Sequence, residues 1–192
     1  MPKCNGKGIA QTLTPGQVDD IMKLLSPKLR GVLSVCRYTA CRHSEALGLT
    51  WANVLTEHIA IPKACTKGKK HSREINLAPP LAEELAIWKQ AWMKEYHREP
   101  TKTDLLFPGK GRVDQRYRRQ SVDHGLRIAC TKLGIEGAST HSFRRSALSM
   151  ASNRGVPLRQ IQEISGHASL SVLQAYLDVT DEQKKAVVRA FY

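Results

Sequence analysis

One stretch, residues 140–178, limits what this chain can fold into more than any other, because glycine and proline divide it into short helical segments. The pattern predicts helices over 142–153 and 157–165, each followed by a glycine, and then a third helix with an apolar stripe. The stretch therefore places four polar side chains in one run of short helices: His141, Arg144, His167 and Tyr176.

Basic residues outnumber acidic ones in this chain of 192 residues, with 30 Lys and Arg against 17 Asp and Glu and a formal net charge of +13. Such a charge favours a polyanionic partner, which would be DNA, RNA or an acidic membrane surface. The sequence has no long apolar run and no signal-peptide pattern, so we expect one soluble, intracellular domain. Five cysteines without a C-x-x-C pair indicate reduced thiols and exclude a zinc-ribbon pattern.

Periodicity elsewhere in the chain predicts mostly helices. The expected helices start near residue 15, cover 29–39, follow the proline pair at 79–80 and end near 133. Period-two alternation over 58–61 and 73–77 predicts two strands instead. The fold class is therefore mainly α with a small antiparallel β-sheet, an α+β fold. A regular stripe in the long helix is interpreted as core: Leu81, Leu85, Trp88 and Trp92.

Two basic segments stand out between these elements. Gly68 supplies a turn between the two strands, which places Lys67 at or near a hairpin tip. Residues 110–119 hold five cations and one acid at a helix entrance. A charge run is often only a solvated face, but this one is also typical of a surface that contacts phosphates. We expect DNA contacts from Lys63, Lys69, Lys70, Arg73, Lys110, Arg112, Arg116, Arg118 and Arg119.

The polar residues suit chemistry on a phosphate that is part of a nucleic acid. His141 and Arg144 lie three positions apart at a helix start, where the helix dipole favours an anion. A second arginine such as Arg42 would neutralise the charge of a pentavalent transition state. Tyr176 needs a base and a cationic pocket, because a reference pKa of about 10 leaves about one phenol in a thousand ionised. Lys67 could protonate the leaving oxygen.

Carboxylates, which hold catalytic metal ions, are scarce in residues 140–178, so the expected chemistry uses no metal and no cofactor. Each candidate residue also has a plainer interpretation. Tyr176 falls on an apolar stripe and alone would be a core residue, and His141 alone would cap a helix or lie at the surface. Arg42 alone could be a structural partner of Glu45. Their joint occurrence at matching spacing favours a single site.

These motifs resemble the catalytic domain of the tyrosine recombinases, also called phage integrases, over residues from about 13 to 178. The Arg box is similar to 39–47 (TACRHSEAL), the hairpin lysine to 66–69 (TKGK), and the H-x-x-R box to 141–144 (HSFR). Gly166 and His167 match the G-H box, and Tyr176 stands in the nucleophile position. The boxes occur in the family's order and spacing, which is a specific signal.

The resemblance implies that Tyr176 attacks the scissile phosphate, which gives a 3′-phosphotyrosyl link and a free 5′-hydroxyl. The other implied roles are phosphate binding by Arg42, Arg144 and His167, proton removal by His141, protonation of the leaving oxygen by Lys67, and support by Glu45. It further implies a site-specific recombinase of double-stranded DNA in the cytoplasm, at the nucleoid of a bacterial or host cell. Such an enzyme is expected to be a monomer when free and a tetramer on synapsed DNA.

The expected domain boundaries follow the same resemblance. Residues 1–13 are a flexible lead-in, 14–180 the catalytic domain and 181–192 a helix that docks on a neighbouring subunit, while the family's N-terminal core-binding domain is absent. Arg145, Ala40, Cys41 and Ser165 depart from the family's usual residues at positions that bear on packing. Two alternatives stay open: a nicking-closing enzyme like the type IB topoisomerases, and a non-catalytic DNA-binding protein on the same fold.

Overall fold

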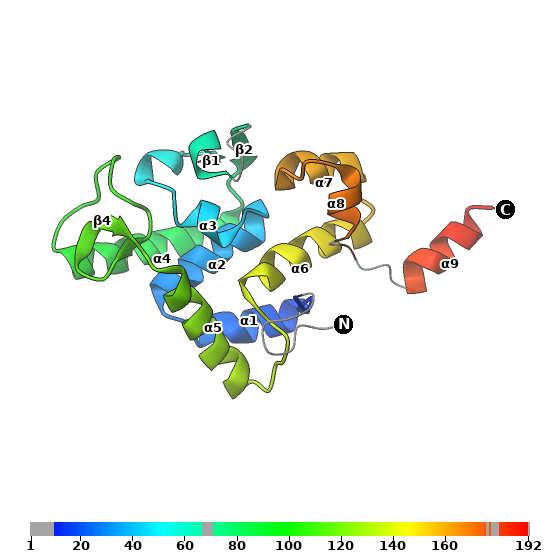
Figure 1. The fold of residues 1–192 in the computed structure, drawn as a ribbon, viewed down its shortest axis with the longest axis horizontal. Helices are drawn as coiled ribbons and strands as arrows, with labels where there is room; N and C mark the ends of the chain where they lie inside the picture. The colour runs from blue at the N-terminus through cyan, green and yellow to red at the C-terminus, as the bar shows by residue number, and fades with distance from the viewer. Residues whose placement is uncertain (1–9, 67–70, 176, 178–180, 192) are drawn as a thin grey trace.

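The computed structural model describes residues 10–66, 71–175, 177 and 181–191, and Figure 1 shows a mainly helical body. The longer helices are α1 (Pro15–Lys23), α2 (Pro27–Thr39), α4 (Pro79–Tyr96), α5 (Arg119–Lys132), α6 (Thr140–Asn153), α7 (Leu158–Ser165) and α9 (Asp181–Arg189). Two short helices are α3 (His43–Ala46) and α8 (Leu170–Gln174), and the strands are β1 (His58–Ile61), β2 (Arg73–Asn76), β3 (Pro108–Gly109) and β4 (Arg112–Arg116). The predicted fold class, mainly α with a small antiparallel sheet, is confirmed.

Helix α1 begins as the sequence predicts. The Gln17 amide donates to the Thr14 hydroxyl oxygen at 3.2 Å, and the Thr14 amide donates to the Gln17 side-chain oxygen at 3.0 Å. This reciprocal capping box, with Pro15 at the first helical position, satisfies backbone donors that the helix itself leaves unpaired.

Helix α2 lies at the centre of the molecule and packs against both α4 and α6 (Figure 1). Its buried face meets the stripe of α4, where Trp88 and Trp92 are fully enclosed, which confirms their interpretation as core residues. The Trp88 indole donates to the Leu106 carbonyl at 2.8 Å, so its polar atom is satisfied inside the core. The α2–α4 pair therefore forms the frame on which the remaining elements are placed.

The first small sheet is the predicted hairpin. Strands β1 and β2 pair antiparallel with His58 opposite Asn76 and Ile61 opposite Arg73, and the loop between them contains residues 67–70, outside the described part of the chain. The second sheet was not predicted, because β4 has four exposed residues out of five and no apolar alternation. Strand β4 therefore pairs antiparallel with β3, and the helix that the basic segment is predicted to enter begins at Arg119.

Residues 140–175 form the expected run of short helices. Gly155 and Gly166 have φ angles of +79° and +66°, which L side chains rarely adopt, and so they end α6 and α7. Helices α6, α7 and α8 enclose a separate small core cluster made by Ala40, Leu148, Ile161 and Leu173. This cluster attaches the run of helices to the end of α2.

The last helix, α9, lies apart from the other helices in Figure 1. Val187 and Val188 are each 56% exposed on it, and Phe191 beyond it is 78% exposed. These apolar side chains are thus available to a partner, while their docking on a neighbouring subunit stays a prediction. None of the helices in the described ranges is both long and apolar enough to cross a membrane.

Candidate active site

The structure brings five of the seven predicted catalytic and supporting residues into one region around the ends of α2 and α7. These are Arg42, Glu45, His141, Arg144 and His167. The other two, Lys67 and Tyr176, lie outside the described residues, as do Lys69 and Lys70 among the predicted DNA contacts. The described part of the site thus consists of two arginines, two histidines and one glutamate.

Arg144 is the buried centre of the site, with 1% of its surface exposed. It projects from α6 toward the end of α2, where Nη1 donates to the carbonyl of Ala40, a residue in the left-handed conformation. Its Nη2 donates to the Ser165 carbonyl at 2.9 Å. Burial, together with the charge of Arg42, lowers the pKa of Arg144 to about 10, so it stays a cation at neutral pH. These contacts fix the direction of the guanidinium before any ligand binds.

His167 follows Gly166 at the end of α7 and is 5% exposed. Its Nε2 lies 3.0 Å from Nη2 of Arg144, and its Nδ1 lies 2.7 Å from the Ser165 hydroxyl oxygen. Because arginine only donates, Nε2 is assigned as the acceptor and Nδ1 as the protonated nitrogen, which donates to Ser165. The Ser165 hydroxyl in turn donates to the Gln162 carbonyl at 3.3 Å. A serine at this position thus fixes the tautomer of His167.

The charge state of His167 follows from its surroundings. Burial and the nearby charges of Arg144 and Arg42 lower its pKa to about 4. The imidazole is therefore neutral at pH 7, and in this conformation it orients Arg144 and adds no positive charge.

Arg42 stands at the start of α3 and is held by Glu45. Its Nη1 donates to one carboxylate oxygen at 2.9 Å and its backbone amide to the other at 3.0 Å. Glu45 is 1% exposed, and burial alone would raise its pKa, but the Arg42 amide and the charge of Arg73 together lower it. The carboxylate is therefore ionised, and Arg42, whose side chain is 28% exposed, presents its remaining donors to solvent.

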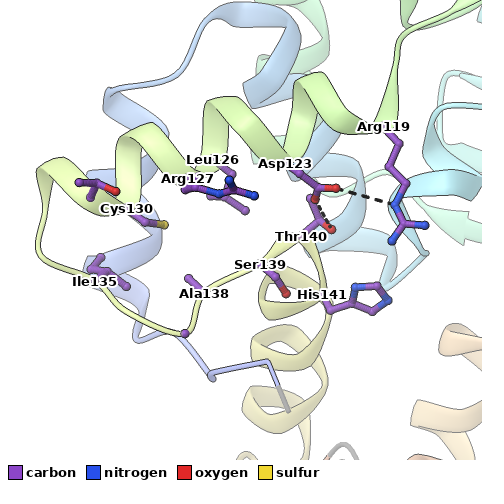
Figure 2. Close-up of a pocket in the computed structure, with 12 residues that line it drawn as sticks. Arg119, Asp123, Leu126, Arg127, Cys130, Ile135, Ala138, Ser139, Thr140 and His141 are labelled. Carbon is purple, nitrogen blue, oxygen red and sulfur yellow. Dashed lines mark hydrogen bonds and ion pairs between the residues drawn. The ribbon is translucent and has the colours of Figure 1, made fainter. Parts of the chain in front are cut away.

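His141 lies at the start of α6, at the rim of a pocket of about 700 Å³ between α5 and α6 (Figure 2). The ring of the buried His43 packs edge-on against it, with 5.8 Å between centroids. Thr140 connects this pair to α5, since its hydroxyl lies 3.3 Å from both Nδ1 of His43 and a carboxylate oxygen of Asp123. Asp123 and Thr140 could not be predicted as parts of the site, because neither belongs to a recognisable motif.

The cations predicted to contact DNA divide into two groups. Six of the described ones are exposed and belong to the hairpin loop, the second sheet or the start of α5: Lys63, Lys110, Arg112, Arg116, Arg118 and Arg119. Arg73 differs, because its side chain is only 10% exposed and is directed into the active site. The contact of Arg73 with DNA stays a prediction, while its position beside Glu45 is that of a residue inside the site.

No three His, Cys, Asp or Glu side chains converge as possible metal ligands within the described ranges. The region instead combines two arginines, two histidines and one ionised carboxylate that holds a cation in place. Such a set can bind a phosphate with the fork of each guanidinium and stabilise extra negative charge on its oxygens.

Comparison with known proteins gives a consistent assignment. Residues 11–183 match the family described as Phage integrase family. Tyrosine recombinase XerC of Corynebacterium efficiens is 31% identical over 154 residues, which are 79% of this chain and 46% of that protein. Tyrosine recombinase XerD of Yersinia pestis is 28% identical over 190 residues, which are 91% of this chain and 60% of that protein. The chain thus spans about half the length of the curated relatives it matches.

Solved structures agree on the fold. The crystal structure of XerA recombinase has a TM-score of 0.76 at 20% identity and covers 100% of this chain and 66% of that one. A post-cleavage complex of the XerH site-specific recombinase with a palindromic difH substrate has a TM-score of 0.75 at 21% identity, covering 96% of this chain and 54% of that one. At these identities the likeness concerns the fold alone.

Proposed function

This chain belongs to the phage integrase family, and from that premise we propose that it cleaves and rejoins DNA strands at specific sites through a phosphotyrosyl intermediate. The observation that carries the proposal is the pre-arranged pair of Arg42 and Arg144. Glu45 orients the first guanidinium, and the Ala40 carbonyl, the Ser165 carbonyl and His167 orient the second. A fixed pair of cations is suited to a phosphate that gains charge in the transition state.

In the proposed reaction the Tyr176 oxygen attacks the scissile phosphorus, and the bond from phosphorus to the 5′ oxygen breaks. The products of this step are a 3′-phosphotyrosyl link and a 5′-hydroxyl, for which Lys67 supplies the proton. His141 assists removal of the phenol proton. Attack of a 5′-hydroxyl on the phosphotyrosine then rejoins a strand and releases Tyr176, so that no metal or cofactor is consumed.

Double-stranded DNA is the proposed partner. The net charge of +13 and the exposed cations of β4 and the start of α5 support this proposal. One relative in the fold comparison, lambda integrase, is described as a dimer bound to a COC′ core site. For this chain we propose a free monomer that assembles as a tetramer on synapsed DNA, with α9 as the exchanged contact, in the cytoplasm and at the nucleoid.

The test uses a pool of nicked 40-base-pair duplexes of randomised sequence. A nick just beyond the scissile phosphate lets the short fragment that carries the new 5′-hydroxyl diffuse away, which traps the covalent complex. The protein is incubated with the pool in excess chelator, denatured, and the DNA that stays attached is sequenced. We expect a defined sequence to be enriched with the wild-type chain and nothing with Tyr176→Phe. An adduct with no enriched sequence would indicate a nicking-closing enzyme, and binding without any adduct would indicate a non-catalytic DNA-binding protein.

A further inference from the structure

Arg73 occupies a position that its basic neighbours in the sequence do not suggest. It lies on β2, yet its Nη2 donates to Oε2 of Glu45 at 2.8 Å and its Nη1 donates to the Ile164 carbonyl at 2.8 Å. We propose that Arg73 is a positioning residue of the active site, which joins the hairpin strand to the Arg42-binding carboxylate and to the end of the helix before His167. The inference rests on the proposed strand-cleavage function and adds a residue to it.

The contact with Glu45 completes the support of Arg42. One carboxylate oxygen of Glu45 accepts from the Arg42 guanidinium, and the other accepts from the Arg42 amide and from Arg73. The carboxylate is thus held from two directions, by α3 itself and by β2. Without Arg73, the Glu45 carboxylate, which is 1% exposed, would keep from the described residues only the donors of Arg42, the residue that it orients.

The contact with Ile164 places Arg73 beside the backbone of His167. The carbonyls of Ile164 and Ser165 are consecutive at the end of α7, and Arg73 donates to the first while Arg144 donates to the second. Helix ends of this kind carry partial negative charge and favour a cation. A Cβ built on Gly166 would lie 2.9 Å from Nη1 of Arg73, so the guanidinium packs directly on the glycine that turns the chain into His167.

The position of Arg73 in the chain gives the bridge a functional meaning. It is the first residue of β2, and Lys67 precedes it by six positions in the same hairpin. Strand β2, which follows the loop that contains the proposed proton donor, is therefore attached through one side chain to both the Arg42–Glu45 pair and the His167 turn. A single anchor would keep the three parts of the site in register during cleavage.

A DNA-contact role for Arg73 and a positioning role make different predictions. A side chain that only neutralises a phosphate weakens DNA binding and lowers the salt dependence of the binding constant by about one contact. A positioning residue instead slows the covalent step at saturating protein and leaves binding and its salt dependence unchanged. A misplacement of about 1 Å can cost on the order of 100-fold in rate.

The experiment compares Arg73→Gln and Arg73→Lys with the wild-type chain on the duplex enriched from the randomised pool. Binding is measured by fluorescence anisotropy at several KCl concentrations, and the rate of adduct formation is measured at saturating protein. We expect both variants to form the adduct 10- to 100-fold more slowly with a Kd within twofold of wild type. Lysine keeps the charge but cannot reach two acceptors as a fork, so it should not restore the rate.

Arg30→Gln is the matched control, because Arg30 also joins two elements outside the site. Its Nε lies 3.0 Å from a carboxylate oxygen of Glu84, which links α2 to α4. It is expected to lower the melting temperature without slowing adduct formation. A third comparison, Arg73→Gln in a Glu45→Gln background, should show a smaller effect than in the wild type, since part of the action of Arg73 passes through Glu45.

The possible results distinguish the proposed strand-cleavage function from the proposed positioning role of Arg73. If wild type forms no adduct, the proposed function is wrong. If wild type forms it and both Arg73 variants match its rate at saturation, with weaker binding and a smaller salt dependence, Arg73 is a DNA contact and the positioning proposal is overturned. A wild-type rate of adduct formation in Arg73→Lys would also contradict the proposal, because lysine cannot join Glu45 and Ile164 as a fork. Should Arg73→Gln fail to fold, the lysine variant decides, because it preserves the charge beside Glu45.

Discussion

Replacement of Glu45 by glutamine is the perturbation that probes the site's internal support most directly. The carboxylate is 1% exposed and accepts from Nη1 of Arg42 at 2.9 Å, from the Arg42 amide at 3.0 Å and from Nη2 of Arg73 at 2.8 Å. Glutamine has nearly the same shape, but it replaces one acceptor oxygen by an NH₂ group that would face an arginine donor. The substitution therefore removes the charge without opening a cavity.

The expected cost follows from the number and kind of these contacts. A hydrogen bond to a charged group contributes about 1.5–3 kcal/mol, and removal of one partner of a buried ion pair costs about 3–5 kcal/mol. Arg42 is partly exposed and regains water, so we expect the free energy of unfolding to fall by about 3 kcal/mol. For a chain of this length that corresponds to a melting temperature lower by about 6–12 °C.

Urea unfolding at 25 °C and pH 7, followed by circular dichroism, measures this loss. Glu84→Gln is the matched control, because Glu84 also pairs with an arginine but is 19% exposed, and it should cost less than about 1 kcal/mol. The pKa of Glu45 is lowered in the folded chain, so its stabilisation is present above pH 4.5 and is lost as the pH falls through the folded value. The difference in the free energy of unfolding between wild type and Glu45→Gln should therefore become smaller as the pH falls. A loss below about 1 kcal/mol at pH 7 would show that the Glu45 charge does not hold the two arginines in place.

Three further predictions concern residues beside Arg144. Gly166→Ala should lower the melting temperature more than Gly134→Ala. Both glycines have positive φ, so alanine costs about 1 kcal/mol in backbone strain at each position, but only at Gly166 would the new Cβ press on Arg73. Equal melting temperatures of the two variants would contradict this contact. The pKa of His167 is lowered to about 4, so between pH 6.5 and pH 4 the imidazole is protonated in the unfolded chain but neutral in the folded chain. Between pH 7 and pH 4.5 the free energy of unfolding, measured in urea, should therefore fall by up to about 3 kcal/mol more in wild type than in His167→Asn. Equal decreases in the two proteins would exclude the neutral state assigned to His167. Ser165→Ala removes the acceptor of the His167 Nδ1 proton, so adduct formation should slow several-fold with unchanged DNA binding, whereas an unchanged rate would show that the tautomer needs no such support.

Periodicity was enough to predict the frame of the fold, because the α4 stripe and the β1–β2 alternation reflect burial on one face. The second sheet could not be predicted in this way. Only Val113 of β4 is even partly buried among its five residues, so backbone pairing and tertiary position create that strand and side-chain pattern does not.

The predicted site residues that the structure describes do gather in one region, because motif spacing reflects which helix ends meet. What spacing could not provide was the direction of single side chains. The basic neighbours of Arg73 predict a DNA contact, yet Arg73 lies two positions before the buried Ile75 on the same face of β2. Alternation along the strand was therefore a signal that Arg73 points inward. The link between His43, Thr140 and Asp123 depends on tertiary packing and had no such signal.

The most direct test of the account is to identify the residue that becomes attached to DNA. The adduct formed on the enriched nicked duplex is digested with nuclease and trypsin and examined by mass spectrometry. We expect a nucleotide on the peptide 160–184, in which Tyr176 is the single tyrosine, with the phosphate linked to the 3′ end of the DNA. A nucleotide on any other residue, or a link to the 5′ end, would contradict it.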